Sequence, residues 1–276
     1  MTELIDDYLE QQYNNRAAVA DFTDYLNSWL SRSEMFRATA EGCLNIPYGK
    51  SKRQLLDIFP LETSRKSPVH VFIHGGYWQA LNKDSFSFMA DAFNQQAECA
   101  VIINYDLCPA VSLAEIIQQL KQAMLWIYAN IADYGGDPQR IQITGHSAGA
   151  HLLATLLTTN WSESGLDNYP FQRLNALSGL YDLQPLLQTS VNKALLLDQT
   201  TAKQGSPLFS QLWKPSKSLS LNLMVGELES QEYKKQSQRL IDSWQNQLDM
   251  SYMQLPATHH FSMLDKFLSS NVWKFI

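Results

Sequence analysis

Cysteine is scarce in this chain, and its spacing carries no metal or redox motif. Three cysteines, Cys43, Cys99 and Cys108, occur among the 276 residues, and no two of them form a C-x-x-C pair. An odd, widely spaced set fits neither a disulfide framework nor a zinc site. We therefore expect free, buried thiols in a protein of a reducing compartment.

Long apolar runs and an excess of basic charge are also lacking. No stretch of about 18 or more consecutive apolar residues occurs, so no transmembrane helix is expected. Residues 1–7 are acidic and lack the apolar centre of a signal peptide. The 21 Lys and Arg residues against 27 Asp and Glu give a net charge of −6, with no basic stripe to replace the counterions of nucleic-acid phosphates. These absences predict a cytoplasmic protein that binds neither nucleic acid nor membrane.

Short apolar runs alternate with helix-like stretches along most of the chain. Strands are predicted at 43–47, 55–59, 69–73, 100–105, 141–144, 173–178, 221–225 and 251–255, with a hairpin joining the first two. Helices are predicted at 83–96, 113–134, 148–159 and 231–247, after one or two helices over residues 3–40. Continuous apolar strands between helices indicate an α/β fold with a mostly parallel sheet covered on both faces.

One serine occupies a predicted sharp turn between a strand and a helix. Residues 145–149 read Gly-His-Ser-Ala-Gly, directly after the apolar run 141–144 and before an Ala/Leu-rich stretch. Glycines two residues to either side of Ser147 permit the strained backbone that holds its hydroxyl clear of the sheet. This context predicts the nucleophile elbow of an α/β-hydrolase. In such a fold, residues 179–217 form a short cap-like excursion over the active site, within a single domain spanning 1–276.

A second motif, His-Gly-Gly-Tyr-Trp at 74–78, follows the predicted strand 69–73. Backbone N–H groups in such a loop stabilise the oxyanion of acyl transfer. We expect Gly76 and Tyr77 to form the oxyanion hole together with Ala148, and His74 to order the loop by hydrogen bonding its backbone. Tyr77 and Trp78 are expected to line the pocket; the alternative is that they only pack against the sheet.

A serine nucleophile needs a base and an acid that fixes the base. In this fold the acid follows a late strand and the histidine follows the last one. Glu229 comes after strand 221–225 and is our candidate acid, with Glu227 as the alternative. His260 comes after strand 251–255 and is preferred to His259 as the base, because the apolar Phe261 after it can anchor the loop.

The remaining histidines do not form a metal-binding pattern. His146 and His151 are five positions apart, without an H-E-x-x-H motif. We expect them to be packed or hydrogen-bonded, and expect neither a metal nor another cofactor. Asp182 is expected to cap the next helix, with a substrate contact as the alternative.

These motifs resemble those of the kynurenine formamidase (arylformamidase) family. The resemblance rests on His-Gly-Gly-Tyr-Trp-Gln at 74–79, Gly-His-Ser-Ala-Gly-Ala-His-Leu at 145–152 and Ser-Gly-Leu-Tyr-Asp-Leu at 178–183. Asn-Ile-Pro-Tyr-Gly at 45–49 and His-Phe at 260–261 add to it. It extends from about Tyr13 to the C-terminus.

The resemblance implies hydrolysis of N-formyl-L-kynurenine to kynurenine and formate, in tryptophan breakdown. Ser147 and His260 match the family's nucleophile and base. The family's usual acid is aspartate, whereas Glu229 occupies that position here. Tyr77, Trp78 and Phe209 are expected to form an aromatic wall for the substrate ring.

Two other functions remain open at this stage. The first is a short-chain carboxylesterase of broad specificity, which uses the same triad. The second is a non-catalytic binding protein with the hydrolase fold. The expected partner is a small aromatic formamide or ester. The sequence leaves the choice between a monomer and a homodimer open.

Overall fold

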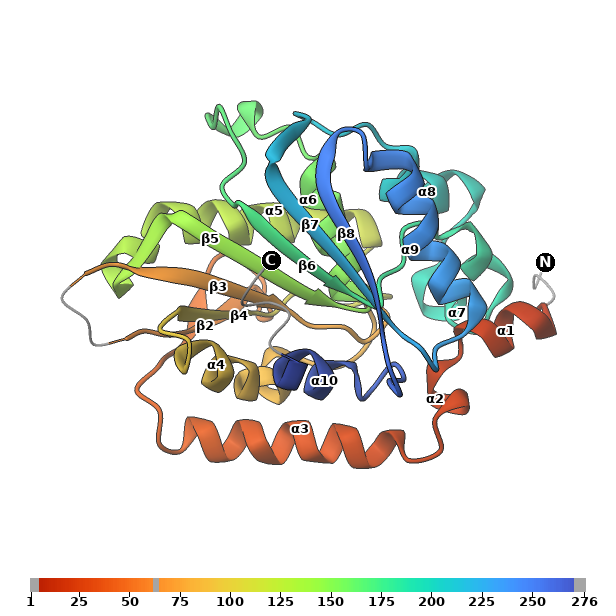
Figure 1. The fold of residues 1–276 in the computed structure, drawn as a ribbon, viewed down its shortest axis with the longest axis horizontal. Helices are drawn as coiled ribbons and strands as arrows, with labels where there is room; N and C mark the ends of the chain where they lie inside the picture. The colour runs from red at the N-terminus through yellow and green to blue at the C-terminus, as the bar shows by residue number, and fades with distance from the viewer. Residues whose placement is uncertain (1–4, 62–64, 271–276) are drawn as a thin grey trace.

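An eight-stranded sheet runs through the molecule, which a computed structural model describes for residues 5–61 and 65–270. The strands are β1 Cys43–Pro47, β2 Leu55–Phe59, β3 Ser67–Ile73, β4 Cys99–Ile103, β5 Gly136–His146, β6 Arg173–Leu177, β7 Ser216–Gly226 and β8 Leu248–Leu255. They lie in the order β1-β2-β4-β3-β5-β6-β7-β8 (Figure 1). β2 pairs antiparallel with β1 and β4, and all other pairs are parallel. The predicted hairpin and mostly parallel sheet are confirmed.

Helices cover both faces of this sheet (Figure 1). One face packs against α5 Leu113–Asn130, α6 Ala148–Thr158 and α9 Gln231–Trp244. The other packs against α3 Phe22–Arg37, α4 Ser87–Asn94 and α10 Met263–Ser270. Because successive strand side chains point to opposite faces, Val71 and Ile73 of β3 join the first apolar cluster and Phe72 joins the second. In the described residues, no helix is long and apolar enough to cross a membrane.

Every predicted strand is present, but the bounds of most strands and of several helices differ from the predicted ones. β1 and β2 coincide with their predicted ranges, while β5 is longer than the predicted 141–144. The helix predicted at 83–96 begins as the 3-10 helix η1 Lys83–Phe86, and that at 113–134 ends as η2 Ile131–Tyr134. A further 3-10 turn, η3 Ser162–Ser164, follows α6, and α10 was not predicted at all.

The N-terminal segment contains three helices where one or two were predicted over 3–40. α1 Asp7–Tyr13 and α2 Asn15–Ala18 precede α3, and positions 3 and 4 lie outside the described residues. The breaks have a local cause: the side chains of Asp6 and Asn14 accept the N–H groups of Leu9 and Ala17 and so cap a new helix start.

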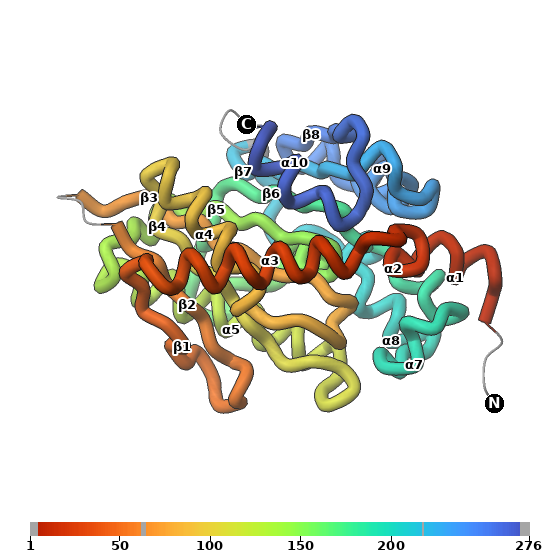
Figure 2. The backbone as a smooth tube through the Cα atoms, turned by 90° about the horizontal axis from the view of Figure 1, so that it is seen from below, coloured from red at the N-terminus to blue at the C-terminus, as the bar shows by residue number. Residues whose placement is uncertain are grey.

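The excursion predicted at 179–217 contains short α-helices and 3-10 helices. These are η4 Gln184–Gln188, α7 Asn192–Leu195, α8 Gln199–Gln204 and η5 Pro207–Phe209. It packs on the N-terminal helices, since Asp6 N–H donates to the Gln188 carbonyl at 2.9 Å and Ser190 N–H donates to Glu10 Oε2 at 2.7 Å. Figures 1 and 2 both show α1 and α2 beside α7. The two segments therefore meet at one end of the molecule.

Candidate active site

Ser147 sits at a backbone position that only a tightly packed turn can hold. It lies between β5 and α6 with φ 57° and ψ −119°. A Cβ at Gly145 would lie 2.4 Å from the Gly149 carbonyl oxygen, and one at Gly149 would lie 2.0 Å from the Ile73 carbonyl oxygen. Larger residues would force these backbones apart. The two glycines therefore let the turn close against β3 and present the Ser147 hydroxyl above the sheet.

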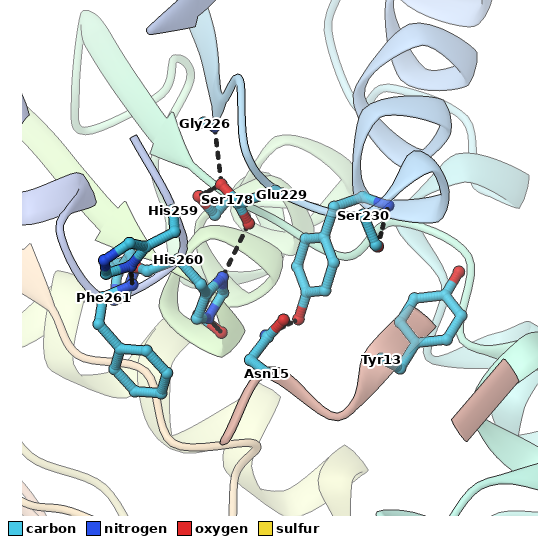
Figure 3. Close-up of polar contacts among 12 residues, drawn as sticks. Tyr13, Asn15, Ser178, Gly226, Glu229, Ser230, His259, His260 and Phe261 are labelled. Carbon is cyan, nitrogen blue, oxygen red and sulfur yellow. Dashed lines mark hydrogen bonds and ion pairs between the residues drawn. The ribbon is translucent and has the colours of Figure 1, made fainter. Parts of the chain in front are cut away.

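Three side chains from separate loops form a hydrogen-bonded row at this edge. Ser147 Oγ lies 3.0 Å from His260 Nε2. His260 Nδ1 lies 2.9 Å from Glu229 Oε2 (Figure 3). All three residues are buried. The structure thus brings together the serine, histidine and carboxylate that the sequence placed after three different strands, in the geometry of a nucleophile, a base and an orienting acid.

The environment of the two candidate acids differs. Glu229 Oε1 accepts hydrogen bonds from Ser178 Oγ at 2.5 Å and from Gly226 N–H at 2.7 Å, which leaves Oε2 for His260 (Figure 3). Glu227 is exposed and accepts the N–H of Ala257. The geometry therefore favours Glu229 over Glu227 as the partner of His260.

The two neighbouring histidines also separate clearly. His259 Nδ1 accepts the N–H groups of Phe261 and Ser262 at 3.2 Å, so this ring stabilises the fold of the loop. Partial burial lowers the pKa of His259. Phe261 is buried against Phe22 and Trp29, as expected of an anchor. The loop is thus fixed on both sides of His260.

His74 orders the loop of residues 74–78, which we call the glycine loop. Its Nδ1–H donates to the Gly75 carbonyl at 2.7 Å, its ring stacks on Tyr105 at 4.3 Å between centroids, and Tyr105 Oη donates to the His74 carbonyl. Burial lowers the pKa of His74 to about 4, so the ring is neutral. His74 orders the loop and lies outside the hydrogen-bonded row, as the sequence suggested.

Backbone donors next to Ser147 are free to bind an anion. Gly76 has φ +110°, and a Cβ there would lie 2.3 Å from the Ala80 carbonyl oxygen. A Cβ at Gly75 would lie 3.0 Å from Ser147 Cβ, so the loop passes directly over the serine. Within the described part of the chain, the N–H groups of Gly76, Tyr77 and Ala148 donate to no acceptor. An oxyanion hole needs unoccupied N–H donors of this kind, so the three groups remain the predicted donors.

A cavity of about 400 Å³ opens in front of Ser147 and His260. Gly75, Gly76 and Tyr77 line it, together with Leu81 and Phe261. The sequence reasoning missed several other lining residues, from the N-terminal helices and the excursion: Asn14, Asn15, Arg16, Trp29, Ser190 and Val191. They belong to polar helical stretches without a motif, so no local pattern marks them.

Two residues expected in the aromatic wall are placed elsewhere, and that part of the prediction is corrected. Trp78 is fully buried and packs edge-on against His151, with 4.8 Å between the ring centroids. Phe209 lies in η5, is 41% exposed and does not line the cavity. Tyr77 alone of the three lines it.

The other polar residues singled out from the sequence have structural partners. His146 Nε2–H donates to the His260 carbonyl, and burial lowers its pKa well below the usual value. His151 Nε2–H donates to the Gly205 carbonyl. Asp182 accepts the N–H of Gln184 at the start of η4 and pairs with Arg239 at 2.6 Å. Across residues 5–61 and 65–270, no cluster of three or more His, Cys, Asp or Glu side chains is placed to hold a metal.

Comparisons with known proteins agree with this geometry. The chain is 29% identical to kynurenine formamidase of Danio rerio over 90% of this chain and 84% of that protein. It is also 29% identical to kynurenine formamidase of Salmo salar over 98% of this chain and 92% of that protein. A solved structure of an unconfirmed thioesterase from Silicibacter sp. tm1040 is 30% identical, with a TM-score of 0.81 and 94% of each chain covered.

The family assignment follows from a match to a family model over more than half of the chain. The model of the BD-FAE family matches residues 56–202, which include both the glycine loop and the nucleophile elbow. These relatives and neighbours are hydrolases, and they share the predicted fold. The chain therefore belongs to the BD-FAE family and is a hydrolase with the α/β-hydrolase fold.

Proposed function

We propose that this hydrolase cleaves N-formyl-L-kynurenine to L-kynurenine and formate. The observation that carries the proposal is the row Ser147–His260–Glu229 beside three free N–H donors, in a chain similar to kynurenine formamidases over most of its length. Ser147, His260 and Glu229 are the proposed nucleophile, base and acid. Gly76, Tyr77 and Ala148 are the proposed oxyanion hole.

Acylation begins at Ser147. Its Oγ attacks the formyl carbon while His260 Nε2, 3.0 Å away, takes the hydroxyl proton. Negative charge develops on the formyl oxygen, where the N–H groups of Gly76, Tyr77 and Ala148 stabilise it. Glu229 accepts the Nδ1–H of His260, which keeps Nε2 in the basic tautomer and stabilises the imidazolium.

The second half of the cycle restores the enzyme. The C–N bond breaks as His260 gives its proton to the departing aryl nitrogen, and a formyl ester remains on Ser147 Oγ. Water, deprotonated by His260, attacks that ester; His260 then returns the proton to Ser147 Oγ as the ester C–O bond breaks and formate leaves. The formyl carbon carries only a hydrogen, so this reaction needs only a small acyl pocket.

The alternative is an esterase for longer acyl groups, and a side-by-side assay separates the two. We expect a higher kcat/KM for N-formyl-L-kynurenine than for its N-acetyl analogue and for p-nitrophenyl butyrate. Each acyl methylene that does not fit should cost about 1–3 kcal/mol, or roughly 10–200-fold. If the butyrate ester is the better substrate and formylkynurenine is scarcely cleaved, the formamidase proposal is wrong and the esterase stands.

A further inference from the structure

Arg16 has an unusual position among the residues that line the substrate cavity. Of the lining side chains in the described part of the chain, it is the sole Lys, Arg, Asp or Glu. The chain as a whole carries a net charge of −6. Among the described residues, the cavity lining therefore carries one guanidinium and no carboxylate.

The guanidinium has no partner within the protein that uses its donors. Within residues 5–61 and 65–270, Arg16 makes neither a hydrogen bond nor an ion pair. Its nearest described interaction is with the Phe22 ring, whose centroid lies 6.0 Å from the guanidinium carbon. That distance is at the outer limit of a cation–π contact. All five N–H donors of Arg16 thus remain available to a ligand.

The backbone that carries Arg16 is held in place by its neighbours. Asn14 Oδ1 accepts the N–H of Ala17 and so caps the turn that contains Arg16. Asn15 Nδ2 donates to Tyr233 Oη at 2.8 Å, and that hydroxyl is bonded to Tyr77 of the glycine loop (Figure 3 shows Asn15 near His260). The amide side chains of Asn14 and Asn15 are occupied in fixing the turn. Of these three consecutive residues, Arg16 is the one whose side chain has no such bond.

We infer that Arg16 binds the α-carboxylate of the substrate and so determines specificity for N-formyl amino-acid anilides over neutral amides and esters. The inference rests on the proposed function, in which the reacting formamide lies at one end of the substrate and an amino-acid carboxylate at the other. A guanidinium fork matches a carboxylate with two parallel N–H···O bonds, which a lysine cannot reproduce. Ser147 and Arg16 line the same cavity of about 400 Å³, a volume within the range of small-molecule sites.

The test compares two substrates that differ only in that carboxylate: N-formyl-L-kynurenine and its decarboxylated analogue. The readout is the kcat/KM for N-formyl-L-kynurenine divided by the kcat/KM for the decarboxylated analogue. In Arg16→Gln we expect this ratio to fall by about 10–100-fold, the range of a hydrogen bond to a charged group. Arg16→Lys should give an intermediate ratio, because it keeps the charge and loses the fork. Added salt should raise the KM of the unmodified enzyme for formylkynurenine more than that of Arg16→Gln.

A matched control removes the same charge elsewhere. Lys52 is exposed in the turn between β1 and β2 and does not line the cavity, so Lys52→Gln should leave the substrate ratio unchanged. If Lys52→Gln lowers the ratio as much as Arg16→Gln, the effect is long-range attraction and the Arg16 assignment is overturned. The Arg16 assignment is also overturned if Arg16→Gln lowers kcat/KM for both substrates by the same factor. It is overturned as well if Arg16→Gln changes kcat/KM for neither substrate. If the unmodified enzyme fails to cleave formylkynurenine but cleaves esters, the proposed function itself falls, which is a different result.

Discussion

The hydroxyl groups of Tyr77 and Tyr233 lie 2.8 Å apart, although 156 residues separate the two positions. Tyr77 Oη donates its proton to the carbonyl of Tyr13. Tyr77 Oη therefore accepts the hydrogen bond that Tyr233 Oη donates. The oxygen of Tyr233 also accepts a hydrogen bond from Asn15 Nδ2. Burial raises the pKa of both tyrosines above the ordinary value, which keeps both hydroxyls protonated. This chain of hydrogen bonds ties the proposed oxyanion loop to α9 and to the N-terminal helices.

Removing one hydroxyl from that chain should loosen the loop. We expect Tyr233→Phe to lower kcat by about 10–100-fold with a smaller change in KM, because a donor displaced by about 1 Å loses much of its effect on the transition state. Steady-state kinetics measure both constants. Tyr8→Phe is the control, since its hydroxyl bonds Glu232 at the surface. Equal kcat values for the two variants would rule out a positioning role for Tyr233.

Replacing the proposed nucleophile should abolish turnover. Ser147→Ala should fold normally and lose about 10⁶ in kcat, because members of a triad act as a unit. Circular dichroism checks the fold, and a fluorophosphonate probe should label the unmodified protein and not the variant. An alanine variant that keeps a tenth of the activity would remove Ser147 from the mechanism.

The two glutamates provide a matched pair of isosteric variants. Glu229→Gln should lower kcat by about 10²–10⁴, since it loses imidazolium stabilisation and favours the wrong tautomer of His260. Glu227→Gln should have little effect, because that carboxylate is exposed and bonds the Ala257 N–H. Measuring kcat for both variants shows which of the two glutamates is the acid of the triad. A damaging Glu227→Gln beside a silent Glu229→Gln would reverse the assignment.

Buried neutral histidines should make the folded state sensitive to mild acid. The pKa values of His74 and His151 fall to about 4 on burial, against roughly 6.5 for an exposed histidine. Between these pH values the two histidines are protonated in the unfolded chain and neutral in the folded chain. The free energy of unfolding therefore decreases as the pH falls from about 6.5 to 4. Each histidine contributes at most about 1.4 kcal/mol per pH unit.

Urea unfolding at several pH values measures this slope directly. His151→Gln removes one of the titrating groups, so the stability of the variant should fall less steeply between about pH 6.5 and 5. Its stability at neutral pH is expected to be lower, which does not affect the slope. A variant with the same slope as the unmodified protein would contradict the assignment of His151 as a neutral buried group.

Much of the fold could be predicted because its signals are local. Strands such as β3 and β4 are buried on both faces, so a continuous apolar run marks them, and the glycines around Ser147 mark a turn that other residues cannot adopt. The order of strand ends then suggested Glu229 and His260, which the structure places in one row with Ser147.

What could not be predicted depends on contacts between distant segments. Trp78 was expected in the cavity, but its ring is buried against His151, and no local pattern encodes a contact between two residues so far apart in the sequence. The wall formed by Asn14, Asn15 and Arg16 arises from packing of α2 beside the excursion and α9, and its residues look like an ordinary solvated helix. Non-local packing of this kind leaves no pattern in the sequence around it.

The distribution of the site along the chain has a consequence for biosynthesis. Asn15 and Arg16 are made before Ser147, and His260 is made after it. In the proposed triad, Ser147 has no base until His260 has left the ribosome and its loop has docked through Phe261. On this proposal a nascent chain gains acyl-transfer activity only when β8 and the loop after it have joined the sheet.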